Sequence, residues 1–399
     1  MPEPSMPEPI RSIAWPSPVR PALGALAQAR SWIEIDLAAL ADNLRAIRTL
    51  IRPARLLFTV KKDAYGHGLL PAARTARQLG VDYLGVACLA EALSLRAAGI
   101  RTPILHLGAA VPEELEAAVR HDVDLTVSTL EEARRLALIA RRAERRARAH
   151  LKVDTGMGRL GLRPEQLVDQ IDDLAGLAEI EWIGLYSHLA DCPGNPALTD
   201  QQLEQFRCVA DATADWLRLR HLGASGALAD RRLHFDMLRV GIAAYGGDPL
   251  RPECGPVMSL KSRLLFIKDC PAGQPISYGA THVTSQATRV GVVAAGYGNG
   301  YPRLLSGRGG VLVGGRLAPI LGRVCMDQFM IDLNNHPGAR VGDTVLLFGR
   351  DGAHYLPAAK VAVWAETISY ELFCTAGMMN ARTYGSAAPV AKTPTPEPA

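Results

Sequence analysis

The 399-residue sequence lacks the hallmarks of several protein classes. No apolar run approaches the ~20 residues that a membrane-spanning helix needs, and the N-terminus has no continuous apolar segment of the signal-peptide kind. The seven cysteines are scattered, odd in number and without C-x-x-C spacing, which argues against zinc sites and disulfide frameworks. No metal site is therefore expected, and a reducing compartment is favoured, so the predicted location is cytoplasmic.

A strong charge imbalance is also missing, because the formal net charge is only +4. The one dense basic stretch, RRAERRAR at 141–148, has no interleaved aromatic side chains and is interpreted as a solvated helix face. Neither a nucleic acid nor a membrane is expected as a partner. The proline-rich ends, residues 1–30 and 387–399, are expected to be disordered because they offer little apolar surface to bury.

What the sequence does contain is a repeated alternation over residues 31–250. Short apolar runs are each followed by a polar turn and an amphipathic stretch rich in Ala, Leu and Arg. Such alternation predicts a parallel sheet, and about eight units predict a (β/α)8 TIM-like barrel, with a doubly wound sheet as the alternative. The runs are RLLFTV (55–60), DYLGVA (82–87), PILHLG (103–108), VDLTVS (123–128), HLKVD (150–154), EWIGLYS (181–187), RHLGAS (220–225) and LHFDMLR (233–239).

The pattern changes near Pro256. Segments such as RVGVVAAGY, GGVLVGGRLAPI and DTVLLFG are β-branched and punctuated by Gly, Pro and Asp. They predict a mostly-β C-terminal domain over residues 251–386. The segment SWIEIDL (31–37) also looks like a strand, which either begins the barrel or pairs with this second domain.

Reactive side chains recur where the predicted strands end, which is where barrel enzymes place their active sites. The loops after strands seven and eight often bind phosphate, and the backbone of Gly241 and Ile242 can approach an anion there. A phosphate at one end of the mouth and a lysine at the other suit pyridoxal phosphate held as a Schiff base. The side chains at these positions are Lys61, Lys152, Arg159, His188, Ser225 and Arg239.

The local sequences resemble the alanine racemase family. VKKDAYGHG (60–68) resembles the stretch that carries the cofactor lysine, and LKVDTGMGRLG (151–161) resembles an arginine-containing motif of that family. GLYSHL, LRVGIAAYG, ISYG, GRVCMDQ and TISYE follow in the family's order. The resemblance covers about residues 31–385, and the full ordered set is hard to obtain by chance.

The resemblance implies a two-base mechanism. Lys61 carries the cofactor and acts as one base, and Tyr278 is the base on the opposite face. Arg239 faces the pyridine nitrogen, and His188 connects it to Tyr278 through hydrogen bonds. Because arginine stays protonated and can only donate, it is expected to leave that nitrogen unprotonated.

The remaining matched residues are implied to bind cofactor or substrate. Lys152 matches a position that is carbamylated in some members, where it orients the arginine. The phosphate is assigned to Tyr65, Ser225, the Gly241 and Ile242 amides, and Tyr370. The substrate carboxylate is assigned to Arg159 and the Met326 amide, with Asp327 beside them.

The family pattern further implies a homodimer, in which Tyr278, Met326 and Asp327 come from the neighbouring subunit. The implied activity is interconversion of L- and D-alanine, supplying D-alanine for peptidoglycan. Three rival functions stay open: a broad-spectrum or serine racemase, a non-catalytic pyridoxal-phosphate-binding protein, and a decarboxylase of basic amino acids. Departures from the family pattern at Lys62, Ala224 and Asn299 bear on substrate breadth.

Overall fold

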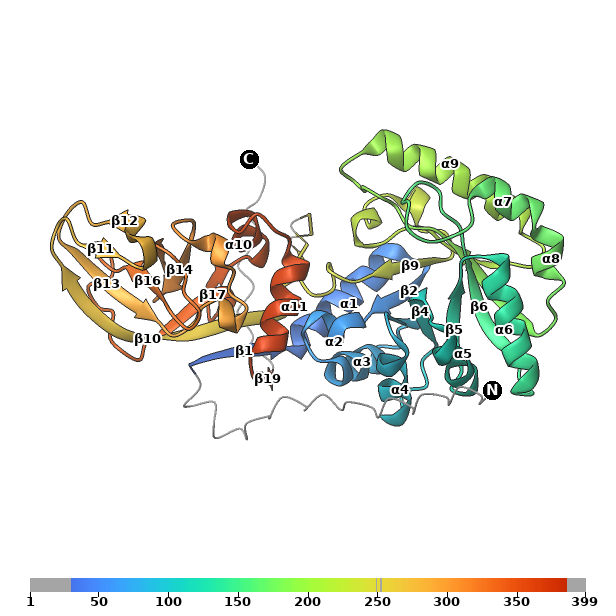
Figure 1. Ribbon diagram of the computed structural model, residues 1–399, viewed down its shortest axis with the longest axis horizontal. Coiled ribbons are helices and arrows are strands. Elements are labelled where there is room, and N and C mark those ends of the chain that lie inside the picture. Colours follow the sequence, from blue (N-terminus) through green and yellow to red (C-terminus); the bar gives the residue numbers. More distant parts are fainter. Residues whose placement is uncertain (1–29, 249, 252, 386–399) are drawn as a thin grey trace, which may run out of the picture.

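A computed structural model describes residues 30–248, 250, 251 and 253–385, in which an α/β barrel and a mostly-β domain lie end to end (Figure 1). The two terminal segments expected to be disordered lie outside the described residues, apart from Arg30. Among the described helices, none combines the length and apolar character needed to cross a membrane.

Eight parallel strands form the barrel, as predicted. The strands at the two ends of the sheet order also meet: Arg239 N donates to Gly223 O at 3.2 Å, and Asp236 N donates to Arg220 O at 3.0 Å. This contact closes the sheet and excludes the doubly wound alternative. In sheet order the strands are β8 (Leu219–His221), β7 (Ile180–Tyr186), β6 (Ala147–Lys152), β5 (Val123–Val127), β4 (Ile104–Ala109), β3 (Tyr83–Val86), β2 (Arg55–Thr59) and β9 (Met237–Val240).

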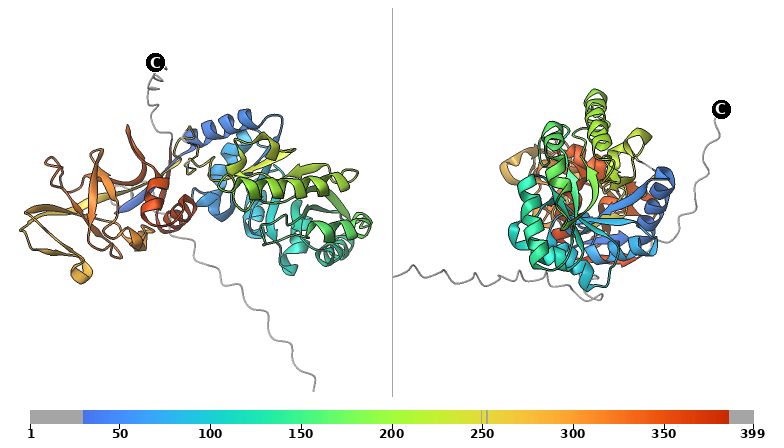
Figure 2. Two further views of the ribbon diagram at one scale, coloured as in Figure 1. Left: turned by 90° about the horizontal axis from the view of Figure 1, so that it is seen from above. Right: turned by 90° about the vertical axis from the view of Figure 1, so that its right-hand side faces the viewer.

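Helices surround the barrel strands, as the end-on view of Figure 2 shows. Local sequence sets where some of them begin: the Asp36 carboxylate accepts from the amides of Ala38 and Ala39, and Thr129 Oγ1 accepts from Glu132 N. The helices are α1 (Leu37–Ile51), α2 (Lys61–Tyr65), α3 (Leu69–Gln78), α4 (Leu89–Ala97), α5 (Pro112–Arg120), α6 (Leu130–Arg142), α7 (Pro164–Asp169), α8 (Ile171–Ala175) and α9 (Pro196–Ala212).

The second domain is built on a mainly antiparallel nine-stranded sheet with two helices, α10 (Ala358–Trp364) and α11 (Ser369–Met379). A short separate hairpin pairs β11 (Pro275–Ile276) with β12 (His282–Val283). The strands of the main sheet are β18 (His354–Leu356), β17 (Thr344–Asp351), β14 (Gly310–Val313), β15 (Arg316–Leu321), β16 (Phe329–Asp332), β13 (Thr288–Val293), β10 (Met258–Cys270), β1 (Ser31–Asp36) and β19 (Arg382–Gly385).

The strand-like segment at residues 31–37 belongs to the second domain. β1 pairs antiparallel with β10 and parallel with β19, so the described part of the chain passes from the β domain through the barrel and back to the β domain. Asn43 on α1 fastens this crossing: its amide donates to Ala244 O at 3.0 Å and to Gly255 O at 2.8 Å. Helix α11, red in Figure 1, lies at the junction of the two domains.

The inside of the barrel is apolar on one side and polar on the other. Leu57, Tyr83 and Leu105 from β2, β3 and β4 form an apolar cluster with Leu219 and Met237. The inward positions of β5, β6 and β7 instead carry buried polar side chains. Those side chains are Asp124, Thr126, His150, Lys152 and Tyr186.

The basic stretch at 141–148 is not one solvated helix face, which corrects that interpretation. Arg141 and Arg142 end helix α6, whereas Arg148 lies on strand β6. There its Nε donates to the buried Asp124 carboxylate at 2.7 Å. Helix α6 ends within this stretch, so its basic side chains are divided between a helix and a strand.

Candidate active site

A cavity of about 320 Å³ opens where the barrel strands end. It brings together most of the side chains singled out in the sequence. Those that line it are Lys61, Tyr65, Lys152, Arg159, His188, Ser225, Arg239, Gly241, Ile242 and Tyr370. Tyr278, Met326 and Asp327 do not line this cavity.

Arg239 is the buried centre of the site. Its Nη2 donates to the carbonyls of Ser187 and Leu222 at 2.7 and 2.8 Å, and its Nη1 donates to His221 O at 2.9 Å. Burial, with Arg159 adding to it, lowers the pKa of Arg239 to about 10, so the guanidinium is still charged at neutral pH. None of its hydrogen bonds to described residues uses Nε.

His188 is held as a neutral ring by this arginine. Arg239 Nη2 lies 3.1 Å from His188 Nδ1, and arginine can only donate. Burial, followed by the charges of Arg239 and Lys152, lowers the pKa of His188 to about 3. With Nδ1 accepting, the single ring proton sits on Nε2, which is left as a donor.

Lys61 begins a left-handed turn. Residues 62–65 have φ of +53 to +54°, a conformation that costs about 1–2 kcal/mol per non-glycine residue. Several contacts hold the turn: Leu69 N donates to Asp63 Oδ1 at 2.6 Å, and Arg382 donates to Gly66 O at 2.9 Å. Burial, then the charge of Arg159, lowers the pKa of the Lys61 amine.

Another part of the cavity wall is a cradle of backbone and hydroxyl groups. Ser225 Oγ accepts from Gly241 N at 3.2 Å and from Ala243 N at 3.3 Å, whereas no backbone acceptor among the described residues receives Ile242 N–H. A Cβ at Gly241 would come within 2.4 Å of Tyr65 Oη, so the backbone approaches closely here.

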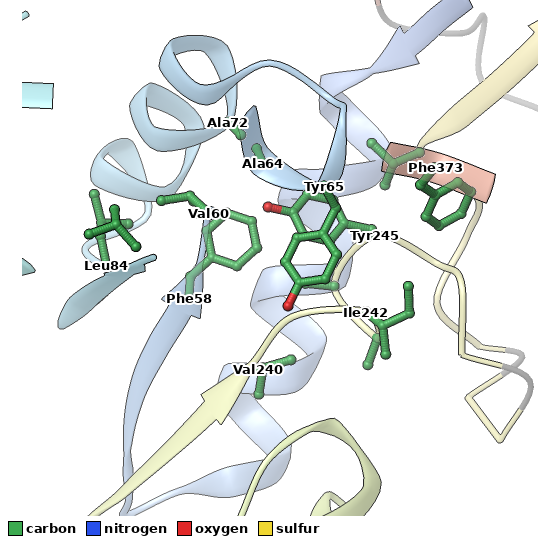
Figure 3. Close-up of a cluster of buried hydrophobic side chains, with 14 of the residues drawn as sticks. Phe58, Val60, Ala64, Tyr65, Ala72, Leu84, Val240, Ile242, Tyr245 and Phe373 are labelled. Carbon is green, nitrogen blue, oxygen red and sulfur yellow. The ribbon is translucent and has the colours of Figure 1, made fainter. Parts of the chain in front are cut away.

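Tyr65 is set by the aromatic packing beneath the cradle. Its ring lies 5.0 Å from that of Tyr245, which in turn lies 5.2 Å from Phe58 on β2 (Figure 3). On the other side the ring of Tyr370 is 5.6 Å from Tyr65. Burial raises the pKa of both Tyr65 and Tyr370, to about 12 for the latter, so both hydroxyls keep their protons at neutral pH.

Arg159 stands on a loop folded around one carboxylate. Asp154 accepts from the amides of Gly156, Met157 and Gly158 at 2.9–3.1 Å and from Arg159 N at 3.2 Å. These N–H groups lower the pKa of Asp154, although burial acts in the opposite direction. The Arg159 side chain is exposed, and no described residue hydrogen-bonds it.

Lys152 lies deeper in the same cavity. Its Nζ donates to Val153 O at 3.2 Å and stands 5.1 Å above the Tyr186 ring. Burial and then the charge of Arg239 lower the pKa of Lys152 to about 7. The amine is therefore about half neutral at neutral pH, which makes it a nucleophile.

The three remaining candidate residues lie on the surface of the β domain. Tyr278 is 72% exposed and Met326 is 54% exposed, and Asp327 is also exposed. In the single chain these three residues therefore lie outside the barrel cavity.

Sequence reasoning missed three residues of this site. Tyr186 lies in the quoted motif GLYSHL, yet only the structure shows its ring stacked on that of His221 at 4.7 Å. His221 contacts Arg239, and Asp154 organises the Arg159 loop. A strand-end position was the available signal for His221, and the Asp-x-Gly-x-Gly spacing was the signal for Asp154.

Both domains match known proteins. The sequence model of the alanine racemase N-terminal domain matches residues 35–249, and that of the alanine racemase C-terminal domain matches residues 257–384. An alanine racemase of Syntrophobacter fumaroxidans is 42% identical over 359 residues, which cover 88% of this chain and 96% of that protein. One from Symbiobacterium thermophilum is 40% identical, covering 89% and 97%.

Solved structures agree with these matches. Alanine racemase from the D-cycloserine producer Streptomyces lavendulae superposes with a TM-score of 0.83 at 36% identity, covering 90% of this chain and 98% of that one. The Bacillus anthracis enzyme with bound L-Ala-P gives 0.80 at 34% identity, covering 91% and 97%. Because sequence and fold agree across both domains, this chain belongs to the alanine racemase family.

Proposed function

We propose that this chain interconverts L- and D-alanine with pyridoxal phosphate held in the barrel cavity, and that the D-alanine serves peptidoglycan synthesis. The observation that carries the proposal is the placement of Lys61, Arg159 and Arg239 around one cavity that ends in an amide-lined cradle. The seven free thiols support a cytoplasmic location.

The charges around the cavity favour anionic ligands. Its described lining holds four cationic side chains, Lys61, Lys152, Arg159 and Arg239, against one carboxylate, Asp191. A phosphate and a substrate carboxylate together carry a negative charge that such a cationic lining can neutralise.

The cradle and the arginine fit this particular cofactor. The Ile242 amide and the Ser225 hydroxyl support a phosphate site here, and a side chain at Gly241 would clash with the Tyr65 hydroxyl. Arg239 Nε remains available as a donor for an acceptor such as a pyridine nitrogen. When bound, pyridoxal phosphate supplies an electrophilic carbonyl and a conjugated ring that acidifies the Cα–H of the attached amino acid.

Lys61 is assigned to proton transfer on one face of the substrate carbon. A lysine of ordinary pKa, about 10.4, would be almost entirely protonated at pH 7. Burial and Arg159 lower the pKa of Lys61, so more of its amine is free to accept a proton. The left-handed turn that follows fixes the direction from which the amine reaches the cavity.

Tyr278 is assigned to the opposite face and comes from a second subunit. The neutral His188 offers Nε2–H, which would donate to the phenolate form of Tyr278 and lower the cost of its deprotonation. Exposed apolar side chains on and immediately before α11, the helix that carries the cavity residue Tyr370, support a homodimer surface. They are Ile368, Met378 and Met379.

Arg159 is assigned to the substrate carboxylate. Its guanidinium is free of hydrogen bonds to described residues and can bind a carboxylate through two parallel N–H bonds. We place the Met326 amide and Asp327 of the second subunit beside it.

The function is tested by exchange of the α-proton. Purified protein with pyridoxal phosphate in D2O is expected to incorporate deuterium at Cα of L-alanine and to form D-alanine. Lys61→Ala should reduce the rate by about 10³-fold or more, because one base and the cofactor attachment are lost. Lys268→Ala, which removes an exposed lysine of the β domain, should retain the wild-type rate. Deuterium incorporation that survives Lys61→Ala would exclude Lys61 as the base.

The shared site is tested by mixing two inactive variants. Lys61→Ala and Tyr278→Phe homodimers should each be nearly inactive. After dissociation and random reassociation, half of the dimers are mixed and carry one intact site of two, so about a quarter of the wild-type activity should return. A site contained within one chain would show no recovery at any mixing ratio.

We further propose that the neutral Lys152 amine adds CO2 to give a carbamate and a proton, which places an anion beside Arg159. The pKa of about 7 sets the sign: carbamate forms above pH 7 and is lost below it as the amine protonates. In CO2-containing buffer, the KM for alanine should fall about two- to tenfold as pH rises through 7. CO2-free buffer and Lys152→Gln should both abolish this response; equal KM values with and without CO2 would rule the carbamate out.

A further inference from the structure

The polar side of the barrel interior carries three side chains that the proposed reaction does not use. Asp124 on β5, His150 on β6 and His221 on β8 are each at most 1% exposed. They run from the first half of the barrel strands to Arg239 at the site. Ionisable groups this deep are costly unless they compensate one another.

The three side chains form a continuous line with Arg239. Arg239 Nη1 lies 2.9 Å from His221 Nδ1, and His221 Nε2 lies 3.0 Å from His150 Nδ1. His150 Nε2 lies 3.4 Å from Asp124 Oδ2 and has no closer polar partner among the described residues. We call these four side chains the barrel relay.

Arginine at one end fixes every proton along the relay. Because Arg239 only donates, His221 Nδ1 must be bare, so the ring proton is on Nε2. That proton points to His150 Nδ1, which must also be bare, and the second ring therefore keeps its proton on Nε2, facing the Asp124 carboxylate. Two neutral imidazoles thus separate a cation from an anion, with their dipoles aligned between them.

We propose that Asp124 is the remote counter-charge of Arg239, and that Asp124 and His150 are positioning residues that hold this arginine as an oriented cationic donor. The inference rests on the proposed function, since Arg239 is taken to face the cofactor. A carboxylate in direct contact would occupy the guanidinium N–H groups and neutralise its field. A carboxylate at the far end of the relay stabilises the buried cation and leaves Nε free.

Other charged and titratable groups face the relay at both ends. Asp124 also accepts from Arg148 at 2.7 Å and from Tyr83 at 3.1 Å, and Arg148 reaches Glu181 at 3.2 Å. Arg148 is about one-third exposed and therefore screened by water, so it offsets only part of the buried carboxylate charge. The groups around Arg239 are Lys152, Arg159, Tyr186 and His188.

The proton positions are tested first, without reference to activity. Long-range 1H–15N NMR of histidine-labelled protein, before and after addition of pyridoxal phosphate, should show His150 and His221 as Nε2–H neutral rings. Burial and the charge of Arg239 hold the pKa of His221 well below its ordinary value, so that ring should stay neutral at neutral pH. A Nδ1–H ring, or a charged ring at either position, would overturn the relay even if the enzyme racemises alanine normally.

The counter-charge is tested in the holoenzyme by removing it while keeping the shape. In Asp124→Asn the amide oxygen still accepts from His150, but the negative charge is gone. The site becomes more positive and its bases lose protons more readily, so the acidic limb of the kcat/KM profile should move down by about 0.5 pH unit. Arg148→Gln should move the same limb slightly upward.

Glu181→Gln provides the matched control. It neutralises a carboxylate that touches the same arginine but not the relay, so the profile should stay in place. An unshifted limb in Asp124→Asn, or an equal shift in Glu181→Gln, would contradict the proposal. If Asp124→Asn fails to fold, the NMR measurement on the unaltered chain still decides.

Discussion

The rest of the site depends on the guanidinium cation of Arg239, which is buried at the mouth of the barrel. Arg239 has no carboxylate in contact among the described residues, and burial of such a cation costs several kcal/mol unless dipoles replace water. Three carbonyls from the ends of β7 and β8 and two imidazole nitrogens do so. The same contacts fix both imidazoles as neutral rings and leave Nε without a hydrogen bond to a described residue.

The second constraint is the junction between the domains. Lys61 starts a left-handed turn that a short loop could not hold by itself, and the β domain supplies its support. Gly66 lies directly against Gly377 of α11, where a Cβ on either residue would clash, and Arg382 of β19 reaches both Asp63 and Gly66. The β domain therefore helps to position Lys61 of the same chain. In the proposed dimer it also contributes residues to the active site of the neighbouring subunit.

Much of the fold could be predicted because it depends on local pattern. Short apolar runs and strand–helix alternation located all eight barrel strands, since parallel strands covered by helices are buried at nearly every position. The position of residues 31–37 could not be settled, because pairing with β10 joins segments more than 220 residues apart. The interpretation of the basic stretch as one helix face was wrong, because its positive charge gives no signal of where helix α6 ends and strand β6 begins.

The site divides in the same way. Lys61, His188 and Ser225 follow barrel strands and Arg239 lies in β9, so their positions could be predicted from the strand pattern. The left-handed turn depends on tertiary contacts that no local pattern carries. His221 and Asp124 looked like ordinary strand residues. Only the structure shows that their side chains face the inside of the barrel and form a line with Arg239.

In the proposed site, Arg239 donates to the ring nitrogen of bound pyridoxal phosphate and leaves that nitrogen unprotonated. The most direct measurement is the 15N resonance of pyridoxal phosphate labelled at the ring nitrogen and bound to the protein. We expect a neutral, hydrogen-bonded pyridine nitrogen at neutral pH, because Arg239, with a pKa of about 10, keeps its proton there. A pyridinium resonance would contradict it.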